Sequence, residues 1–149
     1  MMQLNDALNG VTNLGFDTSP VIYFVEANHR YDALVTEIFQ RVDNGILAGV
    51  TSMITLTEVL VHPIRRSDTM LETKYSDLLL HSANFETRPI GAGIARRAAS
   101  LRGRYNLRTP DALQIATALE SDCQAFLTND RQLSQIPDLR VLVLDELII

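Results

Sequence analysis

The strongest constraint on the fold is the alternation of strand-like and helix-like segments along the whole chain. Segments with apolar residues at helical spacing, such as residues 32–44, separate short apolar runs that are typical of strands. The predicted strands are residues 13–16, 46–52, 85–90, 124–128 and 140–144. Such alternation forms a mostly parallel sheet with helices on both faces. We therefore expect an α/β fold, organised as one domain over residues 1–149.

The ends of two predicted helices carry residues with capping chemistry. Thr109 suits the N-cap of the helix TPDALQIATAL, with Pro110 as its first residue. Thr55 and Glu58 match the Thr-x-x-Glu capping box of a second helix, which we expect Pro63 to end. Asp111 and Glu58 therefore have a purely local interpretation as helix-end residues.

Composition narrows the class of protein. Hydrophobic residues make up 46% of the chain and aromatic residues 6%, which suits an aliphatic α/β core. The single cysteine, Cys123, excludes an internal disulfide and a cysteine zinc cluster. The start MMQLNDALNG has no basic segment followed by a long apolar run, and no stretch reaches the length of a membrane span. We expect a cytoplasmic protein that does not enter the membrane.

Four acids fall at positions where a parallel sheet binds ligands. Asp17 and Asp130 directly follow the first and fourth predicted strands. Glu58 lies in the helix after the second strand, and Asp111 begins the helix that leads into the fourth. Ligands of such sheets bind beyond the carboxyl ends of the strands, near the point where strand order reverses. If the first and fourth strands are neighbours, all four carboxylates converge on one cleft.

A converged set of carboxylates has a chemical consequence. Two like charges about 4 Å apart repel by roughly 4 kcal/mol at an effective dielectric of 20. The cluster therefore needs a cation or shared protons. Oxygen ligands without His or Cys favour Mg²⁺ or Mn²⁺, which activate water and neutralise charge in phosphoryl chemistry.

Four short motifs resemble a known family. FDTSPVIYFVE, TLTEVL, TPDALQIATAL and FLTND are similar, in order and spacing, to the acidic motifs of the PIN domain, above all in VapC-type toxins of toxin–antitoxin pairs. The resemblance extends over residues 15–144. It departs from the pattern at Ser19, where Asn is common, and in about ten extra residues before the first strand. Neither departure removes an expected metal ligand.

The resemblance implies a fold, a site and an activity. The fold would be a three-layer α/β/α domain with strand order 3-2-1-4-5. The catalytic, metal-binding acids would be Asp17, Glu58, Asp111 and Asp130, with Thr128 in support. The implied activity is that of a Mg²⁺- or Mn²⁺-dependent endoribonuclease that cleaves RNA phosphodiester bonds with metal-activated water. Implied partners are the RNA substrate, a small antitoxin protein and a second copy of the chain in a homodimer, for which the apolar helical stretches 21–25 and 34–39 are available.

Arginines are the candidate RNA contacts. The net charge of −5 disfavours simple electrostatic binding of nucleic acid, but twelve of the thirteen basic residues are Arg and six of them fall within residues 88–108. Arg97 and Arg104 share a helix face, and Arg108 lies just before Asp111, so we expect these three to contact phosphates. The alternative is a solvated, ion-paired helix face. The next candidates are then Arg65, Arg66 and Arg131.

Other functions fit less well. IGAGIARRA contains Gly-x-Gly, but Arg96 stands where a dinucleotide fingerprint needs Gly or Ala, so we expect no nucleotide cofactor. A haloacid-dehalogenase-type phosphatase needs a second acid where Ser19 stands. The histidines show no metal or triad spacing: His29, His62 and His81. A PIN-like binding module without catalysis stays open, and metal-dependent RNA cleavage that is lost without Asp17 would separate it from a nuclease.

Overall fold

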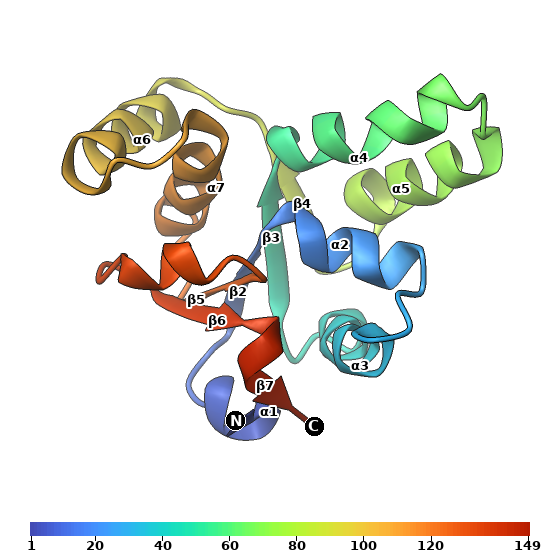
Figure 1. Cartoon of the computed structure of the whole chain (residues 1–149), viewed down its shortest axis with the longest axis horizontal. Helices are drawn as coiled ribbons and strands as arrows, with labels where there is room; N and C mark the ends of the chain where they lie inside the picture. The colour runs from blue at the N-terminus through green and yellow to red at the C-terminus, as the bar shows by residue number, and fades with distance from the viewer.

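A computed structural model describes residues 1–149, with five parallel strands in a central sheet (Figure 1). The elements in chain order are β1 (Met2–Gln3), α1 (Leu4–Ala7), β2 (Asn13–Phe16), α2 (Thr18–Val25), α3 (Asp32–Asp43), β3 (Ala48–Ser52), α4 (Met53–Arg65), α5 (Thr69–His81), β4 (Phe85–Arg88), α6 (Ala92–Tyr105), α7 (Thr109–Glu120), β5 (Ala125–Thr128), the 3₁₀ helix η1 (Arg131–Gln135), β6 (Arg140–Val143), η2 (Leu144–Glu146) and β7 (Leu147–Ile148). None of the helices combines the length and the apolar character that crossing a membrane requires.

The order of the central sheet is β4-β3-β2-β5-β6. For the five predicted strands this is the order 3-2-1-4-5, so the predicted fold class and order are confirmed. Strand β2 pairs with β3 on one side and with β5 on the other, and Leu14 has Gly49 and Ala125 as its partners. The strand order therefore reverses between β2 and β5, which puts the switch point where Asp17 and Asp130 leave the sheet.

Two apolar cores cover the two faces of the sheet, because successive side chains of a strand point in opposite directions. Leu14 and Phe16 belong to the core shared with α2, α3 and α5. Phe126 belongs to the core shared with α6 and α7. Figure 1 shows α6 and α7 on one side of the sheet and α2, α3 and α5 on the other. This is the three-layer arrangement that the sequence predicts.

Two glycines allow close packing within the layers. A Cβ atom at Gly49 would lie 2.5 Å from a ring carbon of Phe85. A Cβ atom at Gly15 would lie 2.7 Å from the Cβ atom of Ala118, on α7. A side chain at either position would force a neighbour to shift.

A small second sheet at the chain ends was not predicted. Strands β1 and β7 pair in parallel, with Met2 beside Leu147 and Gln3 beside Ile148. Each strand has only two residues, so no local pattern reveals it. Figure 1 shows both termini in the same corner of the molecule, next to α1.

The predicted helix ends need two corrections. Thr109 is the first residue of α7 rather than its N-cap, and Arg108 takes the cap position without a side-chain hydrogen bond. The capping box of Thr55 and Glu58 is also wrong. Helix α4 begins two residues earlier, at Met53, with the Ser52 hydroxyl accepting from the Ile54 N–H.

Pro63 does not end α4, which continues to Arg65. The proline lies near the last turn and is buried, and the Asp68 N–H donates to its carbonyl oxygen. Only one helical N–H is lost at a proline, so packing there outweighs the local preference to stop.

Candidate functional site

Asp17 leaves the sheet at the end of β2 and becomes the N-cap of α2. Its Oδ1 atom accepts from the Thr18 N–H at 2.8 Å. Its Oδ2 atom accepts from the Thr128 hydroxyl at 2.7 Å, across from the neighbouring strand β5. Two donors from two elements therefore fix the orientation of this carboxylate.

Thr128 also fixes the start of the turn that carries Asp130. Its hydroxyl oxygen accepts from the Asp130 N–H at 3.0 Å while it donates to Asp17. The Asp130 carboxylate caps η1, and its Oδ1 atom accepts from the Gln132 N–H at 3.0 Å. Thr128 thus contacts both strand-end acids, one through its proton and the other through its oxygen.

The other two acids approach the same edge from helices. Glu58 lies in α4, and its Oε1 atom accepts from the Thr18 hydroxyl at 2.6 Å. Asp111 lies in the first turn of α7 and accepts at Oδ2 from the Arg108 guanidinium at 3.1 Å. The Asp111 side chain is only 16% exposed, whereas the Arg108 side chain is 79% exposed. Each acid is therefore held by a different partner.

The carboxylate charge of Asp17 interacts electrostatically with those of other predicted acids. Burial is the main cause that raises the pKa of the Asp17 carboxyl, and the charges of Asp111 and Glu58 raise it further. Hydrogen bonds from Thr128 and Thr18 lower it, but the balance is upward. In the metal-free protein, ionisation of Asp17 therefore costs more free energy than ionisation of a solvent-exposed aspartate.

Arg108 is the basic residue that interacts with the charges of these acids. Its hydrogen bond to Asp111 and the charge of Asp111 raise the pKa of its guanidinium, and the charges of Asp130 and Glu58 add to the increase. All four predicted acids therefore act electrostatically within one region, at the carboxyl edge of β2 and β5.

The donor set suits a hard divalent cation, because it consists of carboxylate oxygens that repel one another. As they lie in this structure, no three His, Cys, Asp or Glu side chains are close enough to hold a metal ion together. Glu58, Asp111 and Asp130 instead point to Thr18, Arg108 and the η1 backbone. The chemistry of the residues fits Mg²⁺ or Mn²⁺, while three of the four carboxylates are hydrogen-bonded to other partners in this structure.

Sequence reasoning missed a buried polar cluster beneath the acids. Gln114 is 3% exposed and bonds to Ser52, Thr55 and Thr18. Thr18 in turn contacts Glu58. The sequence feature that could have revealed this cluster is Gln114, a single amide in the apolar stripe of TPDALQIATAL, three residues after Asp111.

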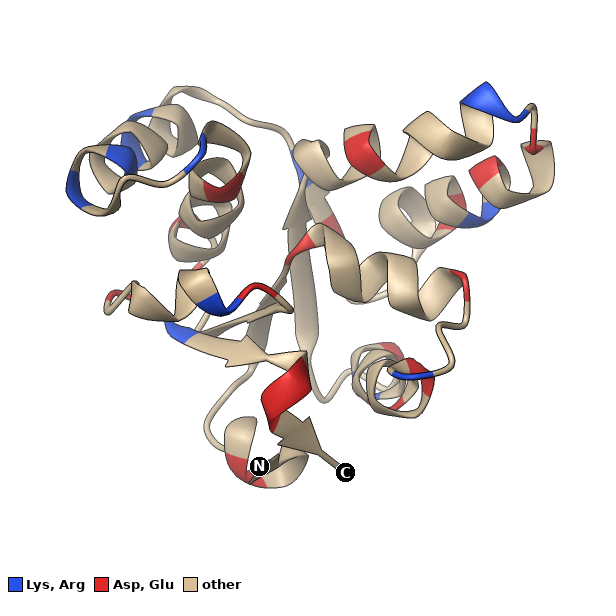
Figure 2. Cartoon of the chain, viewed as in Figure 1, with Lys and Arg blue, Asp and Glu red and all other residues tan.

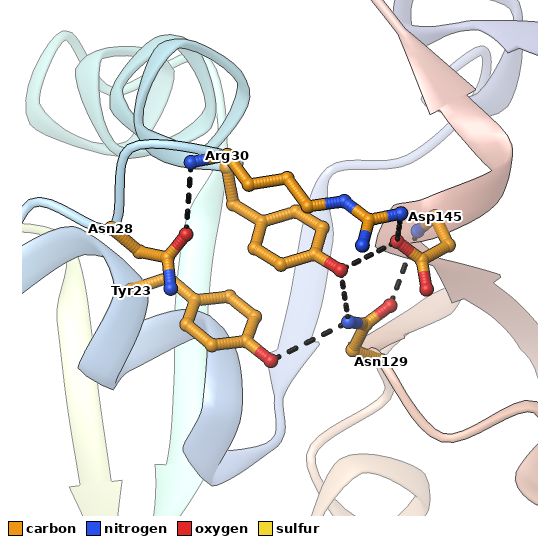
Figure 3. Close-up of polar contacts among 6 residues, drawn as sticks. Tyr23, Asn28, Arg30, Asn129 and Asp145 are labelled. Atoms are coloured by element: carbon orange, nitrogen blue, oxygen red, sulfur yellow. Dashed lines mark hydrogen bonds and ion pairs between the residues drawn. The ribbon is translucent and has the colours of Figure 1, made fainter.

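A second polar cluster fixes the segment next to Asp130 (Figure 3). The Asn129 amide donates to the Tyr31 hydroxyl at 2.9 Å and to the Tyr23 hydroxyl at 3.4 Å, and its oxygen accepts from the Asp145 N–H at 3.1 Å. The rings of Tyr23 and Tyr31 stack with centroids 4.5 Å apart. The residue before Asp130 is thereby tied both to α2 and to the C-terminal segment.

The predicted RNA-contacting arginines lie on α6 and just before α7, where Figure 2 shows basic residues gathered. Arg97 pairs with Glu120 at 3.7 Å and Arg104 pairs with Asp138 at 3.8 Å. Both arginines stay well exposed, at 44% and 63% of their side-chain surface. Ion pairing and exposure therefore coexist on this face.

The apolar stretches that suggested a homodimer pack largely, but not wholly, inside the chain. Val21, Leu34, Val35, Ile38 and Phe39 are all buried in the core on the α2 and α3 side. These five side chains are not free to form an interface, whereas residues 22–25 are only partly buried, and the expected homodimer stays a prediction.

Solved structures of toxin–antitoxin proteins share this fold. VapBC2 from Rickettsia felis, bound to a DNA fragment from its promoter, has a TM-score of 0.70 at 17% identity, over 89% of this chain and 98% of that one. A toxin–antitoxin complex from Klebsiella pneumoniae has a TM-score of 0.66 at 25% identity, again over 89% and 98%. DNA-bound VapBC from Salmonella typhimurium has a TM-score of 0.65 at 15% identity, over 90% and 98%.

A search among curated proteins finds no match to this sequence. The model of one protein family does match, over residues 16–139. That range contains Asp17, Glu58, Asp111 and Asp130, the whole of β3, β4 and β5 and the last residue of β2, and it ends just before β6. With the sheet order and the acids at its switch point, this match shows that the chain belongs to the PIN domain family.

Proposed function

We propose that this chain is a Mg²⁺- or Mn²⁺-dependent endoribonuclease and the toxin of a toxin–antitoxin pair. The observation that supports the proposal is that Asp17, Glu58, Asp111 and Asp130 lie along the same edge of a PIN-domain sheet, near its switch point, and that their charges act on Asp17 and Arg108. The similarity to toxin–antitoxin complexes supports a small antitoxin as partner. A cytoplasmic location fits both roles.

The four acids would hold the divalent ion, which lowers the pKa of water and neutralises charge on the phosphate. Asp17 supplies the most firmly oriented carboxylate, because Thr18 and Thr128 fix both of its oxygens. Thr128 would keep Asp17 and Asp130 in a constant relation. Asp111 would need to leave Arg108, whose exposed guanidinium could then bind a phosphate of the RNA.

Arg97 and Arg104 would extend the phosphate path from Arg108 along α6. Their partners Glu120 and Asp138 lie at distances of 3.7 and 3.8 Å, and exposed ion pairs of this kind contribute little. RNA phosphates can therefore compete for both guanidinium groups.

The test is cleavage of single-stranded RNA with Mg²⁺ or Mn²⁺ and with EDTA. We expect cleavage only with the metal, and its loss in Asp17→Asn. The matched control is Asp68→Asn, because Asp68 also caps a helix through its carboxylate but lies at the start of α5. Metal-independent cleavage, or equal activity of Asp17→Asn and Asp68→Asn, would contradict the proposal.

The second candidate is a PIN-fold module that binds RNA or protein without catalysis. It predicts RNA or antitoxin binding by a chain that never cleaves RNA under any metal condition. The expected homodimer is tested separately by light scattering at micromolar concentration, where a monomer mass would reject it.

A further inference from the structure

A group of buried hydroxyls and one amide lies directly behind Glu58. The Gln114 Nε2 atom is 2.7 Å from the Thr55 hydroxyl oxygen and 3.2 Å from that of Thr18. The Gln114 Oε1 atom is 2.6 Å from the Ser52 hydroxyl. The Thr18 hydroxyl is 2.6 Å from Glu58. The amide of α7 therefore reaches the carboxylate of α4 through a single hydroxyl at the start of α2.

The available protons fix the direction of this network. The Thr51 hydroxyl donates to the Phe16 carbonyl oxygen at 2.8 Å, which uses its only proton. The contact of 2.8 Å between Thr51 and Thr55 must then use the proton of Thr55. Because Thr18 gives its proton to Glu58, the Thr18 and Thr55 oxygens face each other at 3.2 Å with no proton of their own to share.

Only the Gln114 amide can satisfy those two oxygens. Its NH₂ group has two protons, one for Thr18 and one for Thr55. With the amide reversed, its oxygen would lie against the Thr55 oxygen, whose proton is committed elsewhere, and its NH₂ group would face Ser52. The orientation of Gln114 is therefore determined, and through Thr18 it presents a donor to Glu58.

We propose that Gln114 is a positioning residue for Glu58 and acts through the Thr18 hydroxyl. This inference rests on the proposed function, because Glu58 is taken as a ligand of the divalent ion. Thr18 also donates its backbone N–H to Asp17, and Gln114 follows Asp111 by one helical turn. The Gln114 amide thus links α2, α4 and α7, the helices that carry Asp17, Glu58 and Asp111.

A double-mutant cycle tests the path from Gln114 to Glu58. Gln114→Met keeps the length of the side chain without its hydrogen bonds, and Thr18→Val removes the hydroxyl at nearly constant shape. Mn²⁺ affinity is measured by calorimetry. We expect each change to weaken binding by about 10-fold, the lower end of what partners of metal ligands contribute. The double variant should bind no more weakly than Thr18→Val alone, because Gln114 acts through Thr18.

Two controls separate positioning from general damage. Thr18→Ser restores the hydroxyl and should bind Mn²⁺ within about 2-fold of the parent, well short of the loss expected when a ligand partner is removed. Thr117→Val removes another buried hydroxyl of α7, which donates only to its own helix at Leu113, and should have no effect on binding. If Gln114→Met does not fold, Gln114→Leu, which also lacks the amide, takes its place in the cycle, and the comparison of Thr18→Val with Thr18→Ser tests the contact between Thr18 and Glu58 separately.

A metal-free readout keeps this inference distinct from the proposed function. The ¹³C resonance of the Glu58 carboxyl should move in Thr18→Val and Gln114→Met and stay in place in Thr117→Val. If the resonance moves as expected but the parent binds no Mn²⁺, the proposed function fails and the positioning of Glu58 stands. An unchanged resonance in Gln114→Met or in Thr18→Val, or strictly additive losses of Mn²⁺ affinity in the cycle, overturns the inference.

Discussion

Changing Asp17 to Asn should make the metal-free protein more stable and abolish its response to Mn²⁺. Burial and the charges of Glu58 and Asp111 raise the pKa of the Asp17 carboxyl, so at neutral pH its ionised form destabilises the folded state. Asn is as good an N-cap as Asp, so the bond from the Thr18 N–H can be kept. The substitution removes the charge and leaves the shape, while the atom that accepts from the Thr128 hydroxyl becomes an NH₂ group, which can donate to that hydroxyl oxygen instead.

The pH dependence of the parent protein's stability follows from the same raised pKa of Asp17. Because the folded pKa of Asp17 lies above the ordinary value of 3.8, the folded state binds this proton more tightly than the unfolded state does. The contribution of this carboxyl to the free energy of unfolding is therefore fully present below pH 3.8, and it is lost as the pH rises through the pKa that Asp17 has in the folded state. The stability difference between Asp17→Asn and the parent should accordingly grow from acidic to neutral pH.

The size of the metal effect follows from mass action. At a free Mn²⁺ concentration of 100 times its Kd, binding stabilises the folded parent by about 2.7 kcal/mol. For a chain of 149 residues, 1 kcal/mol shifts the Tm by about 2–4 °C. The parent Tm should therefore rise by about 5–11 °C, from the same relation between free energy and Tm.

Thermal melts followed by circular dichroism, with EDTA and with Mn²⁺, measure both effects. Asp68→Asn is again the matched control, and it should keep the full Mn²⁺ shift while its metal-free Tm changes little. The reasoning would be refuted by an Asp17→Asn protein that is less stable than the parent in EDTA at pH 7, or that keeps the parent's Mn²⁺ shift.

Three further predictions follow from other parts of the molecule. Replacing Arg97, Arg104 and Arg108 with Ala should flatten the salt dependence of single-stranded RNA binding, by a log–log slope of up to about 0.7 per lost contact, whereas Arg41→Ala on α3 should not; an unchanged slope would place the RNA elsewhere. Gly49→Ala should lower the free energy of unfolding by about 1–3 kcal/mol in urea titrations, because its methyl group meets a phenylalanine ring, and a neutral result would disprove that close contact. Burial raises the pKa of the Cys123 thiol to about 12, so the native protein should resist alkylation at pH 8 until denaturant is added, and fast labelling of the folded chain would argue against it.

The sequence predicted the layers and the sheet because those depend on patterns within short segments. Strands β2 and β5 were recognised as short apolar runs bounded by turn residues, and their neighbours followed from the order typical of the family. Strands β1 and β7 were missed because two residues carry no periodicity. They exist as strands only because tertiary packing brings Met2 beside Leu147.

The predicted acids lie at the expected edge of the sheet, but their predicted local contacts were wrong. The Thr-x-x-Glu spacing of Thr55 and Glu58 suggested a cap, but Ser52 caps the helix three residues earlier and leaves Thr55 buried inside it. The true partner of Glu58 is Thr18, forty residues away along the chain. A local pattern cannot distinguish these partners, because helix phase and the packing of α2 against α4 decide between them. The buried Gln114 was the one visible sign of such a network.

The pairing of β2 with β5 has a consequence for the timing of synthesis. Leu14 pairs with Ala125, so paired residues of these two central strands lie 111 positions apart in the sequence. At about 5–20 residues per second on the ribosome, the first strand waits roughly 5–20 s for its central partner to be made. Pairing between such distant segments is also intrinsically slow, because a long loop must close before the contacts form. A nascent chain therefore has no sheet edge that unites Asp17 with Asp130 until residue 130 has emerged, so the proposed nuclease site cannot assemble while the first 130 residues are being made.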